Sequence, residues 1–396
     1  MKTKMILLIL LSFQMARAEV ACENKVPFTT WLTEFKTDAV SQGVLPATLE
    51  QVASYLVFNP EVIKRDRSQS VFQQTFLEFS DRMANEQRRK KAQLLLKTTY
   101  KDLFSEIEKK FKVPPEPLLA FWALESDFGS FTGKFQIISS VITLAYDCRR
   151  ADKFRAQAIS ALKLVQRGDI AADEMIGNWA GELGGTQFMA SDYLKLGYDF
   201  DGDGKVNLVK SIPDTLASAA NFLKDKNWKL DEPWMQEVLV PEKLNWLEAD
   251  ITIKHPVARW ADWGVKPVQG TFKDSTLLAS LILPMGRLGP AFLVYPNFNA
   301  FLAWNESMVY STTAAFFATR IAGAPPMQRG TGEIKNLNAV QMLELQNLLI
   351  KRNLNPGVAD GKLGSATRTA VRIAQQSLGL PPDGYPTLEV LEALRK

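Results

Sequence analysis

One segment rich in proline and glycine divides this chain of 396 residues into two unequal parts. Residues 322–326 read Ala-Gly-Ala-Pro-Pro and residues 330–332 read Gly-Thr-Gly, a composition that favours neither helix nor strand. About 60 residues follow it, which is enough for a small separate module. We therefore predict two folded units, at residues 19–325 and 335–396, joined by a linker at 326–334.

Apolar residues recur at helical spacing through most of both units. Residues 24–112 carry this pattern with dense surface charge, and the break at residues 113–115 allows a new helix that stops near Gly129. The pattern weakens between residues 229 and 275 to short apolar runs with scattered Trp and Pro. We predict a mainly α fold with a small irregular or β-containing insertion there, and a helical bundle at the C-terminus.

The first 18 residues have the pattern of a secretory signal peptide. Two lysines precede an apolar run at residues 5–13, and Ala16-Arg17-Ala18 supplies the small residues of a cleavage site. The run is shorter than the ~18–20 residues that span a bilayer, so we expect no transmembrane anchor. We predict a mature protein that begins at Glu19 in the periplasm. Lipidation of Cys22 is the weaker alternative, and pairing of Cys22 with Cys148 is left open.

Composition limits the chemistry. One histidine and two cysteines exclude structural zinc built on those ligands, and they leave carboxylates as the candidates for catalysis. The signal peptide removes three of the 47 basic residues and no acid, so the mature protein is nearly balanced by its 43 acidic residues. That balance gives no argument for nucleic acid as a partner.

Glu125 is the carboxylate in the most unusual setting. It lies seven residues after Leu118 and three after Trp122, so on a helix it shares their apolar face. Desolvation raises the pKa of such a group, which suits a general acid that donates a proton to a glycosidic oxygen. The alternative is a glutamate at a helix end that rotates into water. A glycine-rich stretch at residues 179–189, with Gln187 as donor and acceptor, favours the first interpretation.

Several motifs in order resemble one family. They are Glu125-Ser126-Asp127-Phe128-Gly129, Ala180-Gly181-x-x-Gly184-x-x-Gln187-Phe188-Met189 and Asp199-Phe200-Asp201-Gly202-Asp203-Gly204. Together they are similar to the membrane-bound lytic murein transglycosylase B family, which implies a lysozyme-like helical domain over roughly residues 25–325. Asp360-Gly361-Lys362-Leu363-Gly364 and the residues around it resemble a three-helix peptidoglycan-binding domain. The alternative for this C-terminal module is a bundle that serves packing only.

The resemblance implies that glycan strands of peptidoglycan are the partner, and that Glu125 cleaves the MurNAc-β-1,4-GlcNAc bond without water to leave 1,6-anhydro ends. We expect a monomeric enzyme that requires no cofactor. The side chains that the resemblance places around the sugar are Asn178, Gln187, Trp304, Asn305 and Tyr310. Two residues depart from the family pattern, because Asn178 stands for a usual serine and Ala190 for a usual proline.

Glu182 stands where the family has a small residue, and it is either a second acid near the site or solvent-facing. Two other functions remain open. One is a hydrolytic muramidase in which Glu182 or Asp127 activates water, and the other is a wall-binding protein without catalysis.

An aspartate-rich loop matches the first nine positions of an EF-hand. Asp199, Asp201 and Asp203 stand at positions 1, 3 and 5, with Lys205 at position 7, where the backbone carbonyl binds the ion. The usual glutamate at position 12 is absent, so the loop is one ligand short unless Asp214 reaches back. We expect a structural calcium ion. The alternative is a turn that binds no metal.

Overall fold

The computed structural model describes residues 24–68 and 74–396. The predicted signal peptide at residues 1–18 and Cys22 lie outside the described residues, so the predictions made for them stay predictions. Within the two described ranges, no helix combines the length and apolar character needed to cross a bilayer.

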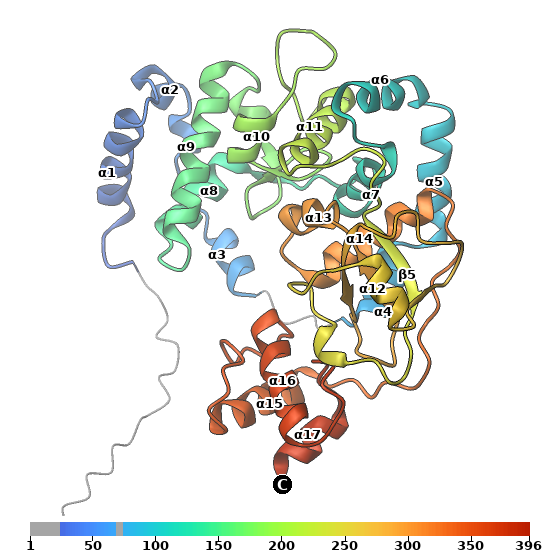
Figure 1. Ribbon diagram of the computed structural model, residues 1–396. Helices are drawn as coiled ribbons and strands as arrows, with labels where there is room; N and C mark the ends of the chain where they lie inside the picture. The colour runs from blue at the N-terminus through green and yellow to red at the C-terminus, as the bar shows by residue number, and fades with distance from the viewer. Residues whose placement is uncertain (1–23, 69–73) are drawn as a thin grey trace, which may run out of the picture.

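The fold is mainly helical, which confirms the predicted class. Within residues 24–68 and 74–112, six helices precede the break at residues 113–115, as the periodicity of this region indicates (Figure 1). They are α1 (Phe28–Ser41), α2 (Pro46–Gln51), α3 (Pro60–Arg67), α4 (Phe76–Met83), α5 (Glu86–Lys97) and α6 (Lys101–Phe111). A short 3-10 helix, Ala53–Tyr55, lies between α2 and α3.

Helix α7 (Pro115–Ser126) lies at the centre of the large unit. It packs against α5, α6, α11 and α14, and nine of its twelve residues are buried. Pro115 starts the helix because a first turn tolerates proline. Further helices of this unit are α8 (Ile137–Tyr146), α9 (Ala151–Arg167), α10 (Ala190–Leu196), α11 (Ile212–Asp225), α13 (Phe298–Trp304) and α14 (Met308–Ile321).

The glycine-rich stretch forms two of the four strands of a small antiparallel sheet. Its order is β1-β2-β3-β4, and each strand has only two residues. The strands are β1 (Phe135–Gln136), β2 (Ile176–Gly177), β3 (Glu182–Leu183) and β4 (Phe188–Met189), with a 3-10 helix at Ala172–Glu174 before β2. Strands β3 and β4 carry part of the second motif, which runs from Ala180 to Met189.

The predicted insertion is a five-stranded antiparallel sheet, and it extends past residue 275. The sheet order is β6-β8-β9-β5-β7. Its elements are β5 (Met235–Leu239), β6 (His255–Pro256), β7 (Lys266–Pro267), β8 (Leu278–Ile282) and β9 (Ala291–Val294), with α12 (Val257–Asp262) and the 3-10 helix Trp246–Glu248. The predicted boundary missed β8 and β9 because these strands are buried almost throughout, so their sequence shows no alternation of apolar and polar residues.

The C-terminal module has three helices around its own core, as predicted. They are α15 (Ala339–Lys351), α16 (Ser365–Ser377) and α17 (Leu388–Arg395). The buried amide of Gln346 accepts from Gly361 N (2.7 Å) and donates to Lys362 O (3.0 Å) and Thr367 Oγ1 (3.1 Å). Gln346 of α15 therefore connects the Asp-Gly-Lys-Leu-Gly motif to Thr367 of α16.

The module contacts the large unit directly (Figure 1). Arg372 of α16 donates to Asp250 Oδ2 (2.6 Å), and Arg368 donates to the backbone carbonyls of residues 283 and 284 (3.3 and 2.6 Å). Residues 326–334, the predicted linker, contain no helix or strand. They are nevertheless held along the large unit, for example by Arg329, which pairs with Asp81 at 2.9 Å.

Candidate active site

Glu125 lies in the last turn of α7, and the local sequence explains why the helix ends there. Asp127, Phe128 and Gly129 have φ values of 51°, 60° and 80°, which reverse the chain. Only glycine adopts this conformation without cost, so the other two side chains must be held by contacts. Asp127 pairs with Arg88 (Nε to Oδ1, 3.1 Å), and Phe128 packs edge-on against Trp122. The carboxyl group is thereby fixed at the helix end.

Two donors meet on one oxygen of Glu125. Trp304 Nε1 donates to Oε1 at 2.9 Å, and the hydroxyl of Tyr310 donates to the same atom. An ordinary carboxyl group carries its proton on the oxygen that accepts fewer hydrogen bonds, so the transferable proton belongs on Oε2. Burial raises the pKa of Glu125 to about 7, the hydrogen bonds from Tyr310 and Trp304 oppose this rise, and the charge of Glu182 adds to it. The group can thus hold and release a proton near neutral pH.

Aromatic packing fixes the two donors. The indole of Trp304 stacks on Phe121 of α7, with ring centroids 4.1 Å apart, and meets Phe188 and Phe222 edge-on. Tyr310 begins the buried face of α14, and burial raises the pKa of its hydroxyl well above the usual value. It therefore stays a neutral donor. The spacing of residues in the sequence did not predict that Trp304 and Tyr310 contact Glu125; only the family resemblance pointed to them.

Close backbone approach ties the glycine-rich stretch to α7. Gly184 has φ of 74°, and a Cβ atom there would collide with the carbonyl oxygen of Leu208. The hydroxyl of Ser126 donates to the carbonyl oxygen of Gly185, which links the residue after Glu125 to this stretch. Sequence reasoning missed Ser126, although it stands inside the first motif.

Asn178 and Gln187 form one network of amides with Glu182. The Nδ2 group of Asn178 donates to Glu182 Oε2 and to Gln187 Oε1 (3.1 Å), while its Oδ1 accepts from the backbone of Ala180 (2.8 Å) and Glu182 (3.1 Å). Gln187 donates to the carbonyl oxygens of residues 132 and 184 (3.2 and 2.8 Å). The amide of Asn178 is thus fully engaged within the protein, and its predicted contact with the sugar stays a prediction.

Asn305 and Tyr310 line a cavity of about 1010 Å³. Phe79 of the large unit also lines it, together with Arg368 and Tyr385 of the C-terminal module. Asn305 ends α13, and its Oδ1 accepts from Ser307 N at 2.9 Å. The volume is at the upper end of what ligand sites have. Tyr310 therefore connects Glu125 to a space large enough for a chain ligand.

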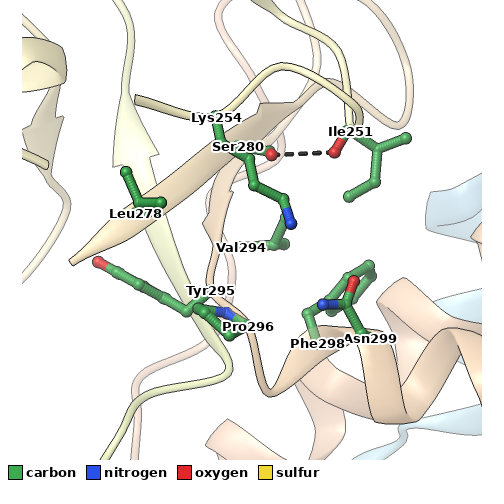
Figure 2. A pocket seen from close by; sticks show the side chains of 9 residues that line it. All are labelled: Ile251, Lys254, Leu278, Ser280, Val294, Tyr295, Pro296, Phe298 and Asn299. Carbon is green, nitrogen blue, oxygen red and sulfur yellow. Dashed lines mark hydrogen bonds between the residues drawn. The ribbon is translucent and has the colours of Figure 1, made fainter. Parts of the chain in front are cut away.

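A second hollow, in the five-stranded sheet, is far smaller (Figure 2). Its volume is about 10 Å³, and Ser280 donates across it to Ile251 O at 3.0 Å. Lys254 and Asn299 point toward the same space in Figure 2. A volume of this size holds about one water molecule. None of the predicted site residues lines it.

The aspartate loop brings three carboxylates together. Oxygens of Asp199, Asp201 and Asp203 lie within 4.8 Å of one another. Asp214 lies behind the loop, where its two oxygens accept from Phe200 N (2.8 Å), Asp201 N (3.4 Å) and Asn207 N (2.8 Å). Burial raises the pKa of Asp214. For Lys205 the backbone N donates to Asp203 Oδ1 at 2.8 Å.

Comparison with known proteins follows the division into two units. The model of the family described as Transglycosylase SLT domain matches residues 27–319, and that of a peptidoglycan binding domain matches residues 338–394. Membrane-bound lytic murein transglycosylase B of Escherichia coli (strain K12) is 27% identical over 215 residues, which are 54% of this chain. The aligned part is 58% of that relative, less than two thirds of its length.

Two solved structures extend the likeness. SltB3 from Pseudomonas aeruginosa, in complex with NAG-anhNAM-pentapeptide, is 36% identical with a TM-score of 0.87, over 93% of this chain and 99% of that chain. Escherichia coli Slt35 in complex with calcium has 22% identity and a TM-score of 0.63, over 74% of this chain and 92% of that chain, and shows the shared fold. The resemblance drawn from the motifs is confirmed, and this chain belongs to the Transglycosylase SLT domain family.

Proposed function

We propose that the protein is a lytic transglycosylase that cleaves the MurNAc-β-1,4-GlcNAc bond of peptidoglycan and leaves 1,6-anhydroMurNAc ends. The observation that carries this proposal is the state of Glu125. Burial raises its pKa to about 7, two donors hold Oε1, and Oε2 is left to carry a proton. Membership of the family, and the glycan fragments bound to SltB3, support the same activity.

One carboxyl group can perform both proton transfers. Glu125 Oε2 gives its proton to the glycosidic oxygen while the bond from that oxygen to C1 breaks, and the electron pair leaves with the oxygen. The positive charge at C1 is shared with the ring oxygen and the substrate's N-acetyl group. The carboxylate of Glu125 then takes the proton of the C6 hydroxyl, whose oxygen bonds to C1. The acid is restored and no water is consumed.

A hydrolytic muramidase is the alternative, and it needs a second group to activate water. Asp127 is poorly suited to that role, because it forms an ion pair with Arg88 at the helix end. Glu182 is engaged with Asn178 through one oxygen. Mass spectrometry of products made in ¹⁸O water distinguishes the two reactions. We expect anhydro ends without label, and label at the reducing end would identify a hydrolase.

Glu125→Gln tests the site itself. The substitution keeps the shape and hydrogen bonds of the side chain but removes the transferable proton. We expect activity to fall by the ~10²–10⁴-fold typical of general acid-base catalysis, with glycan binding retained. Full activity in this variant would contradict the whole assignment, whereas a wild type that is itself inactive on purified cell wall would favour a wall-binding protein without catalysis.

We further propose roles for the remaining predicted groups. Gln187, Trp304, Asn305 and Tyr310 border the glycan site, and residues 335–396 bind peptidoglycan in addition to packing on the large unit. The predicted signal peptide supports action in the periplasm. If sedimentation with purified cell wall retains the protein no better than a version with a disrupted C-terminal module, the module serves packing only.

A calcium ion fits the aspartate loop. Three carboxylates converge there, and oxygen ligands in this arrangement suit a hard divalent cation. Asp199, Asp201 and Asp203 would hold the ion, with the backbone of Lys205 and the carboxylate of Asp214 as the further candidates. Its contribution would be to the stability of the loop, and the reaction above does not pass through it.

A further inference from the structure

Glu182 is a carboxylate that the reaction above does not use. It lies in β3, where its backbone pairs with Met189 of β4, and its side chain is half-buried. Oxygen Oε2 accepts from Asn178, while Oε1 accepts no hydrogen bond from any residue in the described part of the chain. One oxygen is therefore anchored, and the other has no hydrogen-bond donor among the described residues.

Asn178 acts as a rigid support for this carboxylate. Its Oδ1 accepts two backbone N–H groups, from Ala180 and from Glu182 itself, so its amide plane cannot turn. Its second N–H is held by Gln187 Oε1 at 3.1 Å. The family's usual serine at position 178 has one hydroxyl and could not make this set of contacts. Asn178 and Glu182, which both differ from the residues usual in the family at these positions, are thus one structural unit.

Glu182 and Glu125 have different surroundings. Burial raises the pKa of Glu182, whereas the hydrogen bond from Asn178 and the charge of Lys153 on α9 oppose this. Glu125 faces Trp304 from α13, Tyr310 from α14 and Glu182 from β3, and none of these is a cation. Two carboxyl groups in such different surroundings can take different roles, one as an acid that holds a proton and the other as a negative charge.

We propose that Glu182, held by Asn178, supplies a fixed negative charge that stabilises the positively charged sugar formed when the glycosidic bond breaks. This role rests on the proposed function, because only bond cleavage through a cationic sugar creates that charge. Pre-organised charges in a site of low polarity stabilise transition states because they need no rearrangement during the reaction. Glu182 neither gives nor takes a proton in this role, which separates it from a base that activates water.

The charge of Glu182 has a second, measurable effect on Glu125. A negative neighbour favours the protonated acid, and it therefore helps to raise the pKa of Glu125. Removing that charge lowers the pKa of Glu125, so the acid loses its proton at a lower pH. The alkaline limb of the pH-activity profile should then move to lower pH. A residue that serves packing alone would not produce this movement.

The test compares Glu182→Gln with the wild-type enzyme on purified glycan strands. Glutamine keeps the size of the side chain and an oxygen that accepts from Asn178. We expect kcat to fall by about 10²-fold, in the range found for removal of one electrostatic group, with KM little changed and the alkaline limb at lower pH. Glu182→Asp keeps the charge and should recover part of kcat and the position of the limb. Glu116→Gln is the matched control, since Glu116 is a half-buried carboxylate at the other end of α7 whose pKa burial also raises.

Unchanged kcat and an unmoved limb in Glu182→Gln would overturn the proposal. So would equal losses in Glu182→Gln and Glu182→Asp together with a lower Tm, because the role would then be structural. Product masses keep the two proposals apart. If the wild type adds ¹⁸O and Glu182→Gln abolishes that addition, Glu182 is a water-activating base and both proposals fail. If the wild type gives anhydro ends while Glu182→Gln behaves as wild type, only the role of Glu182 is lost.

Discussion

The two oxygens of Glu125 have different surroundings, and this difference determines what the residue can do. Oε1 receives an indole N–H and a phenol O–H, whose donors stand 179 and 185 residues further along the chain. These donors favour the carboxylate that exists between the two proton transfers, while burial favours the acid that exists before them. The balance leaves a pKa of about 7, so neither state is strongly disfavoured at neutral pH.

Tyr310→Phe should move that balance in a known direction. The hydrogen bond from Tyr310 lowers the pKa of Glu125, so its loss raises that pKa and keeps the acid protonated to higher pH. We expect the alkaline limb to move up by about one unit, because a hydrogen bond to a charged group contributes roughly 1.5–3 kcal/mol and one pH unit corresponds to ~1.4 kcal/mol. The direction is opposite to that expected for Glu182→Gln. A pH profile of kcat measures it.

Tyr295→Phe provides the control. Tyr295 is a buried tyrosine of the large unit, but its hydroxyl bonds the neutral amide of Gln236 at 3.1 Å in the five-stranded sheet. Loss of that hydroxyl should leave the limb in place. Equal movement in both variants would mean that the effect comes from general loosening of the fold and not from the contact with Glu125.

At the scale of elements, the sequence predicts helices better than strands. In the described parts of residues 24–112 the amphipathic pattern corresponds to six helices, and the apolar residues before Glu125 made it the candidate acid, with a glutamate that rotates into water as the alternative. The two-residue strands β1 to β4 are too short to show a pattern, and β8 and β9 are buried almost throughout. The convergence of Trp304 and Tyr310 on Glu125 is a tertiary event, so only the family motifs could indicate it. Nothing in the basic run at residues 88–91 marks Arg88 as the partner of Asp127.

Asp203→Asn tests the aspartate loop as a calcium site. Asparagine keeps an oxygen for the hydrogen bond from Lys205 N (2.8 Å), so the turn survives while one anionic ligand is lost. A ligand that binds only the folded state stabilises it by about 2.7 kcal/mol when its free concentration is a hundred times Kd. We expect calcium to raise the Tm of the wild type above its value in chelator, and to raise that of Asp203→Asn much less.

The exposed Asp173, outside the loop, gives the control variant Asp173→Asn, which should respond to calcium as the wild type does. If wild type and Asp203→Asn have the same Tm with calcium as with chelator, the aspartates serve the turn and bind no metal.

At the scale of the whole molecule, the C-terminal module is part of the wall of the large cavity. Arg368 and Tyr385 line that cavity together with Tyr310, which also contacts Glu125. Residues 326–334, where proline and glycine predict a linker, contain no helix or strand, and Arg329 holds them to the large unit through Asp81. Composition can predict where a chain lacks helix and strand. It cannot predict docking, which here depends on arginines of α16 meeting acceptors more than eighty residues away in sequence.

Arg372→Ala should separate the module from the large unit without unfolding either one. The substitution removes the contact with Asp250, an ion pair whose side chains are only 15% and 22% exposed. Loss of one partner from such a partly buried pair leaves the other charge without compensation, which costs a few kcal/mol at most sites. We expect faster proteolysis within residues 326–334, while cleavage of short soluble glycan fragments is retained because Glu125 and its donors belong to the large unit. Arg395→Ala is the control, since Arg395 pairs with Glu344 on the exposed surface of the module itself. If Arg372→Ala resists protease as the wild type does, the docked arrangement does not depend on this contact, and the cavity wall must be held by other residues of α16.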